Sequence, residues 1–413
     1  MPARAARMWA PRAPPSTSPA IWSATGIRPP DRTGAEDIAM KITAIRAHAV
    51  LLKVELDITS PAKTPSHQAC VVEIETDAGI TGHGITSIGP AVPIKAAVDA
   101  VAAPQIIGMD PLNNDRIWDR LYWALIPRGQ TGIGMHAIAA IDVALWDIKG
   151  KALGQPVWRL LGGAREACPV YTTFGFGFYD LEELPVAANA WRERGFSRLK
   201  MTVGNSALQR RDEPRLLSDV IREDEARVAA VRDAAGEDAE LFIDANCSLD
   251  YFHAVELASA LSPYHISFFE EPITQNDVLQ MAELRRQTGM RVACGQNEAQ
   301  SYRFRDMLVA GAVDIVQPNV VITGGFTQCQ KIAALASGFN VGIDNGGAWP
   351  FFNAHLQAGV ANGGLVEWHY SSVEACRLIY DGLPEAKDGW FKMSKGPGLG
   401  FELNTGRLER YVI

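Results

Sequence analysis

The sequence predicts an α/β protein in two parts, a parallel β/α barrel and a smaller α+β unit before it. Three observations support this prediction. From residue 168 onward short apolar runs alternate with helical stretches, polar residues end these runs at a nearly constant spacing, and the residues before 168 have the pattern of a sheet followed by helices. A chain of 413 residues is too long for one ordinary domain and allows two packed units.

The smaller unit begins at Met40 with three strand-like stretches. They are KITAIRAHAVLLKVEL, HQACVVEIETDAG and ITGHGITSIG, and the glycine at position 79 predicts a turn between the last two. Residues 91–162 then change to helical spacing, and the last predicted helix ends at Gly154-Gln155-Pro156. A small antiparallel sheet followed by helices is an α+β arrangement.

Eight apolar runs make up the larger unit. They are CPVYTTFGF, SRLKMTV, ELFIDAN, ISFFEEP, RVACGQN, VDIVQPN, NVGIDN and LVEWHY. Helical stretches such as EDEARVAAVRDAAG separate them, and eight strands with seven intervening helices predict a parallel barrel that lacks its final helix. From Asp244 to Glu367, the polar residues that end the runs recur every 22 to 26 residues, which indicates one repeated β/α unit.

The composition is that of a globular protein, and its charge favours a small-molecule ligand over a nucleic acid. Apolar residues make up 47% of the chain and charged residues 21%, and no apolar run approaches the roughly 20 residues that span a membrane. The net charge of −8, without any block of Lys and Arg, argues against a nucleic-acid partner. Six isolated cysteines suit a reducing compartment, so we expect a cytoplasmic protein whose cysteines are packing residues.

Residues 1–39 differ in kind from the rest of the chain. The stretch MPARAARMWAPRAPPSTSPAIWSATG is rich in Arg, Pro, Ala and Ser, and no acid precedes Asp31. This composition fits a transit peptide, a disordered tail, or an upstream start codon ahead of a true start at Met40. We interpret residues 1–39 as a disordered or mis-started extension.

Polar side chains end every barrel strand from the second onward, and the C-terminal ends of barrel strands share one mouth. Asp244 and Glu270 come from adjacent strands, and the next strand offers the amide oxygen of Gln296. Mg²⁺ prefers such oxygen ligands and keeps open positions for water or substrate, so this trio predicts a magnesium site. The full set of strand-end residues is Lys200, Asp244, Glu270, Gln296, Asn319, Asn345 and Glu367.

Three motifs give the chain a family resemblance. The helix AIAAIDVALWDIKGKALGQPVWRLLG (137–162), the strands FIDAN and FFEEP, and the glycine pair of ITGGFTQ (322–328) resemble those of the mandelate racemase/muconate lactonizing branch of the enolase superfamily. The resemblance covers about Met40 to the C-terminus. It implies an α+β capping domain at 40–165, a (β/α)₇β barrel at 166–370, and a C-terminal segment at 371–413 that returns to the capping domain.

The resemblance also implies a chemistry. Enzymes of this branch remove a proton α to a carboxylate with the help of Mg²⁺, whose ligands by position would be Asp244, Glu270 and Gln296. Such a proton is weakly acidic, so the reaction needs both a metal and a base with a tuned pKa. The capping loops 57–67 and 127–136 are expected to close over the substrate. Relatives usually form dimers or octamers, and we expect a homo-oligomer.

Four positions depart from the pattern of the family. Thr202 stands where the second strand usually offers a catalytic Lys, and Asn319 and Asn345 stand where the sixth and seventh strands usually offer titratable residues. Gln296 replaces an acidic ligand, which removes one negative charge from the metal site and should weaken Mg²⁺ binding. The catalytic positions at the mouth are then Lys200, Thr202, Asn319, Asn345 and Glu367.

Three explanations of these departures stay open. Gln296 could be a single engineered change, the chain could bind an acid without reacting, or other mouth residues could carry the chemistry, which we favour. Lys200 could have a lowered pKa through desolvation. Glu298 could replace Gln296 as ligand, because residues two apart in a strand point to the same side. Contacts to substrate or metal ligands are expected from Asn246, Glu298, Tyr171 and His67; Asp344 and His369 are further candidates, although we interpret His369 as structural.

We therefore expect a Mg²⁺-dependent lyase that dehydrates a small sugar acid, an aldonate or aldarate, with no other cofactor. Among relatives, sites with one base and a polar mouth usually dehydrate, because a neighbouring hydroxyl leaves once the enediolate forms. A racemase, epimerase or cycloisomerase is the alternative enzyme, and racemisation needs a base on each face of the substrate. A non-catalytic homologue that binds an acid is the alternative outside enzymes.

Overall fold

The computed structural model describes residues 40–413 except 128–129, 131 and 206. The extension predicted at 1–39 lies outside the described residues, as does part of the capping loop predicted at 127–136. Over the described part of the chain, no helix combines the length and the apolar character needed to cross a bilayer. All six cysteines are free, and all except Cys247 are buried, as expected of packing residues.

A three-stranded antiparallel sheet opens the described chain, as predicted. Its strands are β1 (Ile42–Lys53), β2 (Ser66–Thr76) and β3 (Thr81–Ser87), paired in this order. The helices that follow are α1 (Ala91–Ala97), η1 (Val98–Ala102), α2 (Ala103–Ile106), α3 (Asn114–Leu125), α4 (Ile133–Leu153) and the short α5 (Val157–Leu160). Together they make the α+β unit that the sequence predicts.

Helix α4 joins this unit to the barrel. On one side it packs directly on β3: a Cβ at Gly84 would lie 2.0 Å from the carbonyl oxygen of Ala140, so only glycine allows this close approach. On another side it contacts helix α11 (Gly325–Gly338) of the barrel. Because it is covered from two sides, α4 is apolar around most of its circumference.

Two buried acids on α4 accept hydrogen bonds from distant parts of the chain. The carboxylate of Asp142 accepts from the backbone N–H (3.0 Å) and the hydroxyl (2.6 Å) of Thr327, at the start of α11. Asp147 accepts from the backbone N–H groups of His83 (3.1 Å) in β3 and Leu399 (2.9 Å). Both carboxylates therefore connect separate segments of the structure.

Eight parallel strands form the barrel. They are β4 (Ala167–Gly175), β5 (Arg198–Thr202), β6 (Glu240–Asp244), β7 (Ile266–Glu270), β8 (Val292–Cys294), β9 (Ile315–Val316), β10 (Gly342–Ile343) and β11 (Val366–His369). Neighbours from β4 to β10 pair in sequence, and β11 pairs with β4. Between β10 and β11 the ring is closed by a bridge from Ile343 to Gly363 and by a backbone hydrogen bond from Asn345 to Leu365.

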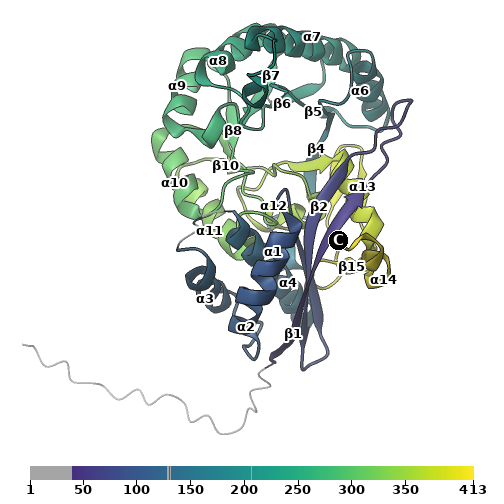
Figure 1. The fold of residues 1–413 in the computed structure, drawn as a ribbon, viewed down its shortest axis with the longest axis vertical. Coiled ribbons are helices and arrows are strands. Elements are labelled where there is room, and N and C mark those ends of the chain that lie inside the picture. Colours follow the sequence, from purple (N-terminus) through teal and green to yellow (C-terminus); the bar gives the residue numbers. More distant parts are fainter. Residues whose placement is uncertain (1–39, 128–129, 131, 206) are drawn as a thin grey trace, which may run out of the picture. The chain divides into compact units, whose positions relative to one another are not determined.

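The barrel helices lie outside the strands, and α6 to α10 follow one another in an arc around them (Figure 1). They are α6 (Glu183–Glu193), α7 (Leu217–Ala235), α8 (Tyr251–Ala260), α9 (Val278–Thr288) and α10 (Ser301–Ala310), followed by α11 and α12 (Pro350–Gly359). Short 3₁₀ turns lie at η2 (Ala207–Arg210), η3 (Ser262–Tyr264) and η4 (Thr274–Asn276). Inside the ring, an apolar layer supports the mouth: Tyr171, Phe242, Phe268, Ala293 and Ile315.

The C-terminal segment contacts both units. It begins with α13 (Tyr370–Ile379), a helix directly after β11 that the sequence pattern did not indicate. The remaining elements are β12 (Tyr380–Asp381), β13 (Ala386–Lys387), β14 (Trp390–Lys392), β15 (Glu402–Leu403), α14 (Thr405–Leu408) and η5 (Glu409–Tyr411). Strand β14 pairs with β4, and Val412 bridges to Val50 of β1. The domain boundaries near 165 and 370 stay predictions.

Candidate active site

Four charged side chains meet at the C-terminal ends of β5, β6, β7 and β11. The ammonium of Lys200 lies 3.2 Å from Asp244 Oδ2, 2.6 Å from Glu270 Oε2 and 2.9 Å from Glu367 Oε1. The strand register brings the acids together, because Asp244 pairs directly with Glu270 on the next strand. Each of the four residues is at most 3% exposed. Three carboxylates therefore share one ammonium away from water.

Burial and crowding decide the charges in this cluster. Burial by itself would lower the pKa of Lys200, but the carboxylates of Glu270 and Glu367 raise it well above its ordinary value. Burial and the neighbouring Asp244 raise the pKa of Glu270, whereas Lys200, working against burial, lowers the pKa of Glu367. The prediction of a lowered pKa for Lys200 is wrong, because acids surround the ammonium and keep it protonated.

Gln296 follows β8 and turns its amide towards this cluster. Its Nε2 donates to Asp244 Oδ2 (3.1 Å) and to Glu271 Oε2 (3.1 Å), and the residue is 4% exposed. The nitrogen and oxygen of an amide exchange places when the group turns over, so the same side chain can present Oε1 at this position. The structure therefore brings Gln296 together with the two predicted acidic ligands.

Glu298, the alternative third ligand, makes different contacts. Its carboxylate accepts from the guanidinium of Arg303 at 3.0 Å and from Asn276 Nδ2 at 3.1 Å. The ion pair with Arg303 satisfies much of its hydrogen-bonding capacity. These contacts favour Gln296 over Glu298 as the residue beside Asp244 and Glu270.

Glu271 is a candidate that the sequence pattern did not single out. Its fully buried carboxylate accepts from Gln296 Nε2, from the backbone N–H of Asn297 (3.3 Å) and from Asn276 Nδ2 (3.1 Å). It thereby fixes the Gln296 amide and the loop after β8. The only signal was the doubled acid of FFEEP, whose second member strand alternation places on the opposite side. A positive φ of 40° at Glu271 changes the chain direction there.

The side chains at the three positions where the resemblance leads one to expect bases form hydrogen bonds with backbone groups. Asn319 Nδ2 donates to two glycine carbonyls in the loop after β10, at 2.8 Å each. Asn345 Nδ2 donates within the same loop (2.9 Å), and its Oδ1 accepts from the backbone N–H of Glu367 (3.1 Å). Thr202 donates to a carbonyl at the end of β4 (3.2 Å). These contacts shape the loop after β10 and the strand ends, and the catalytic roles predicted for the three residues stay predictions.

Two further predicted residues border the cluster directly, and a third does not. The ring centroid of Tyr171 lies 5.4 Å from Lys200 Nζ, so this residue forms part of the floor below the ammonium. The backbone N–H of Asn246 donates to Asp244 Oδ1 at 2.8 Å and orients that carboxylate. Asp344 instead accepts from a backbone N–H just before β11 (2.7 Å).

A second polar group lies at the rim, where β2 meets the barrel. His67 Nε2 lies 2.9 Å from the hydroxyl of Ser371, and the same hydroxyl lies 3.3 Å from His369 Nδ1. Burial lowers the pKa of His67 to about 4 and also holds the pKa of His369 below its ordinary value. Both imidazoles are therefore mainly neutral near pH 7.

Comparison with known proteins identifies the family. Residues 43–162 match the mandelate racemase / muconate lactonizing enzyme N-terminal domain, and residues 183–407 match the enolase C-terminal domain-like family. A D-galactarolactone cycloisomerase from Agrobacterium fabrum is 33% identical over 389 residues, which cover 90% of this chain and 99% of the relative. The chain belongs to the mandelate racemase/muconate lactonizing enzyme family.

Two other members of this family extend the comparison. A D-galactonate dehydratase from Xanthomonas campestris pv. campestris is 35% identical over 275 residues, 66% of this chain and 69% of the relative. The crystal structure of a racemase from Streptomyces coelicolor with bound magnesium is 28% identical, with a TM-score of 0.79 over 90% of this chain and 100% of that one. The predicted N-terminal capping domain and (β/α)₇β barrel are confirmed, and the chain is an enzyme of the enolase superfamily.

The mouth of this family member has the features of a cation site. Within the described ranges, no three His, Cys, Asp or Glu side chains are grouped so as to hold a metal ion, and the third predicted ligand, Gln296, is an amide. Glu270 Oε1, however, is buried without a hydrogen-bond partner among the described residues. Such an atom costs about 1–3 kcal/mol, which a neighbouring cation would offset. A Cβ at Gly346 would lie 2.7 Å from this oxygen, so glycine leaves it uncovered. These features fit Mg²⁺.

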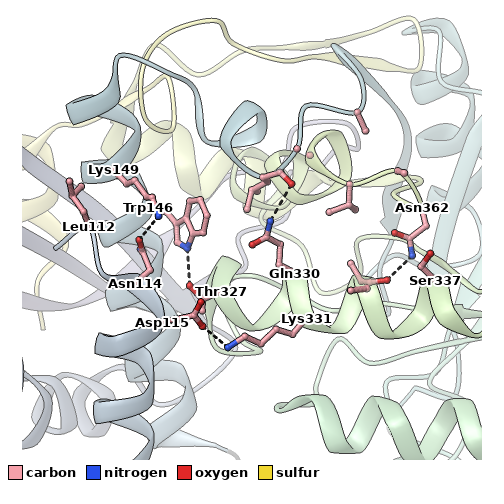
Figure 2. A pocket seen from close by; sticks show the side chains of 18 of the residues that line it. Leu112, Asn114, Asp115, Trp146, Lys149, Thr327, Gln330, Lys331, Ser337 and Asn362 are labelled. Atoms are coloured by element: carbon pink, nitrogen blue, oxygen red, sulfur yellow. Dashed lines mark hydrogen bonds and ion pairs between the residues drawn. The ribbon is translucent and has the colours of Figure 1, made fainter. Parts of the chain in front are cut away.

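A large surface cavity lies elsewhere on the molecule. It has a volume of about 1210 Å³ and is lined by residues from the start of α3, from α4 and from α11 (Figure 2). Its side chains pair with one another: Lys149 donates to Asn114 (3.2 Å), and Lys331 forms an ion pair with Asp115 (2.6 Å). Because these groups are already paired, while Glu270 Oε1 has no hydrogen-bond partner in the part of the chain that the structure describes, we place the candidate active site at the mouth of the barrel.

Proposed function

We propose that this enzyme binds a small polyhydroxylated carboxylic acid at the mouth of the barrel, removes the proton α to its carboxylate, and dehydrates it. The observation that carries the proposal is the buried cluster in which three carboxylates share the ammonium of Lys200 and one oxygen of Glu270 has no partner among the residues that the structure describes. The relatives named as a D-galactonate dehydratase and a D-galactarolactone cycloisomerase support a sugar acid, an aldonate or aldarate, as the substrate.

Asp244, Glu270 and Gln296 are the residues that we propose to hold Mg²⁺. When bound, the ion would supply positive charge beside the substrate carboxylate and make the α-proton more acidic. To act as a ligand, Gln296 turns its amide over, so that Oε1 replaces the Nε2 that now donates to Asp244. The magnesium in the related racemase from Streptomyces coelicolor supports this assignment.

Lys200 is the residue that we propose to bind the substrate carboxylate. Because its ammonium stays protonated, it donates hydrogen bonds and stabilises the negative charge that develops as the α-proton leaves. Its high pKa makes it unsuited to serve as the base near neutral pH. Glu367, at 2.9 Å, holds the ammonium in place.

A cycloisomerase is the second candidate function, because the D-galactarolactone cycloisomerase aligns with 90% of this chain. Both reactions begin with removal of the α-proton, so the same cluster serves either. A racemase has less support, since racemisation needs a proton-transferring group on each face of the substrate and Thr202, Asn319 and Asn345 do not titrate. We also propose that the enzyme acts in the cytoplasm, and that it forms a homo-oligomer, a dimer or octamer, as the family resemblance implies.

The test is loss of the α-proton from a panel of aldonic acids, aldaric acids and their lactones in the presence of Mg²⁺. Proton NMR in D₂O follows the α-proton, and a carbonyl-specific reagent detects the 2-keto acid that dehydration yields. We expect at least one aldonate or aldarate to lose its α-proton and form a 2-keto-3-deoxy acid. Conversion of a lactone without release of water supports the cycloisomerase instead. Retention of the α-proton by every acid at saturating Mg²⁺ contradicts the proposal.

A matched pair of variants tests the metal assignment. Glu270→Gln should abolish both turnover and the rise in unfolding temperature on addition of Mg²⁺, because it removes a negative charge from the ligand set. Glu240→Gln, at the exposed start of β6, changes the same functional group away from the mouth and should retain both. A normal Mg²⁺ response in Glu270→Gln removes Glu270 from the ligand set.

A further inference from the structure

We propose that His369 is the catalytic residue that takes the α-proton from the substrate and passes it on, and that Ser371 and His67 position its imidazole. The inference rests on the proposed function, because that reaction needs a base. Three carboxylates already share the ammonium of Lys200, and the residues at the usual base positions are amides or a hydroxyl. A neutral imidazole at the mouth supplies what the cluster lacks.

The strand geometry places His369 next to the cluster. His369 ends β11 two residues after Glu367, so both side chains point to the same side of the strand. The pairing with β4 agrees, because Glu367 lies beside Tyr171 and His369 lies beside Thr173, which donates to Glu367 at 2.5 Å. His369 therefore stands one step further out along the mouth than Glu367, where a substrate bound to Lys200 would lie.

The surroundings of His369 suit a proton-transferring group. The charged groups that act on it are Glu367, Lys200 and Asp244 from the barrel strands, and His67 faces it from β2 with 6.2 Å between the ring centroids. The ring centroid of Phe176 lies 5.0 Å from that of His369, so an apolar side chain packs beside the imidazole. Burial lowers the pKa of His369 and Glu367 raises it, with a net lowering that favours the neutral form.

The two ring nitrogens of His369 have different surroundings. Nδ1 accepts the backbone N–H of Ser372 as the N-cap of α13 (3.3 Å) and lies 3.3 Å from the hydroxyl of Ser371. That hydroxyl in turn lies 2.9 Å from His67 Nε2. Over the described ranges, Nε2 of His369 forms no hydrogen bond. Because Nδ1 is engaged, we assign Nε2 as the nitrogen that acts on the substrate.

The Ser371 hydroxyl sets which nitrogen of His369 carries the proton. When it accepts from Nδ1–H and donates to His67, Nε2 of His369 has a lone pair and can act as a base, and in this tautomer Nδ1 no longer accepts from the backbone N–H of Ser372. When it accepts from His67 and donates to Nδ1, Nε2 of His369 carries a proton and can donate it. The chain of three side chains thus allows one imidazole to serve in both directions.

The proposed reaction balances with His369 alone as the proton carrier. The Nε2 lone pair takes the α-proton, the C–H bond breaks, and its electron pair moves towards the substrate carboxylate beside Lys200, leaving an imidazolium. In the second step the imidazolium gives this proton to the β-hydroxyl. The electron pair returns to form the C–C double bond as the C–O bond breaks, and water leaves. The enol that remains becomes the 2-keto acid without any oxidant or reductant.

His369→Asn tests this proposal. Asn keeps a side-chain acceptor for the N-cap of α13 but cannot carry the proton. We expect α-proton exchange in D₂O and turnover to fall at least about 100-fold, with Mg²⁺ affinity by calorimetry unchanged. His253→Asn, at the start of α8 on the outside of the barrel, is the matched control and should keep the wild-type rate. His369→Gln is a second variant with the same expectation.

The positioning role is tested separately through the pH–rate profile. Ser371→Ala and His67→Gln should each shift the acidic limb of the profile, whereas residues with a purely structural role would change stability and leave that limb in place. An unmoved acidic limb in both variants overturns the positioning role.

If folded His369→Asn with normal Mg²⁺ affinity exchanges the α-proton within tenfold of wild type, His369 is not the base and the proposed function survives. If the wild-type enzyme exchanges no α-proton from any acid, both proposals fail.

Discussion

Two sets of buried acids in this molecule have different surroundings. On α4, Asp142 and Asp147 each accept two hydrogen bonds from N–H or O–H groups of other segments. At the mouth, Asp244, Glu270 and Glu367 share one ammonium, and Glu270 Oε1 has no partner within the described ranges. Burying a carboxylate is costly in both places. The first set therefore stabilises the fold, and the second is held ready for a ligand.

This difference gives a criterion for telling a structural buried acid from one in a binding site, which sequence motifs alone do not provide. Asp147 and Glu270 both lie in stretches that resemble family motifs, and both are completely buried. Besides the position of Glu270 at a strand end, the count of hydrogen-bond donors around each carboxylate separates them. An acid whose oxygens are all paired is part of the scaffold, whereas an acid with an unpaired buried oxygen marks a binding site.

The largest effect is expected when the mouth loses its shared ammonium. Lys200→Met should abolish turnover and lower the free energy of unfolding by about 3–5 kcal/mol in the absence of metal, because the buried acids lose their counter-charge. Urea unfolding with and without Mg²⁺ measures this, and Mg²⁺ should restore part of the loss. Arg198→Met on the same strand removes a more exposed ion pair with Glu240 and should cost at most about 1 kcal/mol. If both variants lose the same free energy of unfolding, the ammonium at the mouth contributes no more to stability than a surface ion pair.

A smaller effect on the free energy of unfolding, dependent on pH, is expected from replacing Asp142 on α4. Burial raises the pKa of Asp142 from 3.8 to about 7. The folded protein therefore keeps a proton that the unfolded chain releases between about pH 4 and 7, so this contribution to stability declines as pH rises through that interval and is constant above it. Asp142→Asn should flatten the stability profile between pH 5 and 8 by about 1–3 kcal/mol, measured by urea unfolding. Parallel profiles for the variant and wild type would show that Asp142 does not titrate there.

The smallest effect is expected from restoring an acid at the third ligand position. Gln296→Glu should tighten Mg²⁺ binding by about tenfold, because it adds a negative charge beside Asp244 and Glu270. Calorimetry measures the affinity, and Gln280→Glu, exposed on α9, is the matched control. If Gln296→Glu leaves the affinity unchanged while Glu298→Gln weakens it, then Glu298 is the third ligand.

Most of the fold could be predicted from the sequence because the barrel repeats one unit. Polar residues at a regular spacing marked the strand ends, and parallel register then placed Asp244 beside Glu270. Features that depend on a local change of chain direction could not be predicted. Glu271 reaches Gln296 through a positive φ, and α13 begins where His369 caps a helix directly after a strand.

The chemistry of the site could be predicted only in part, because several elements determine each property. Residue types at the strand ends indicated the acids and Lys200, but the raised pKa of Lys200 comes from carboxylates on three other strands. The link between His67 and His369 through Ser371 joins residues from the two ends of the described chain. No spacing in the sequence predicts such a contact.

Strand β4 has a consequence for how the protein is made. It hydrogen-bonds to β5, which follows soon after it, but also to β11 and β14, which lie near the other end of the chain. A growing polypeptide on the ribosome therefore carries an open strand edge until β11 (Val366–His369) has been made, and that edge is free to pair wrongly. Late closure of the ring between distant strands, rather than formation of the helices, should set the pace at which native protein appears.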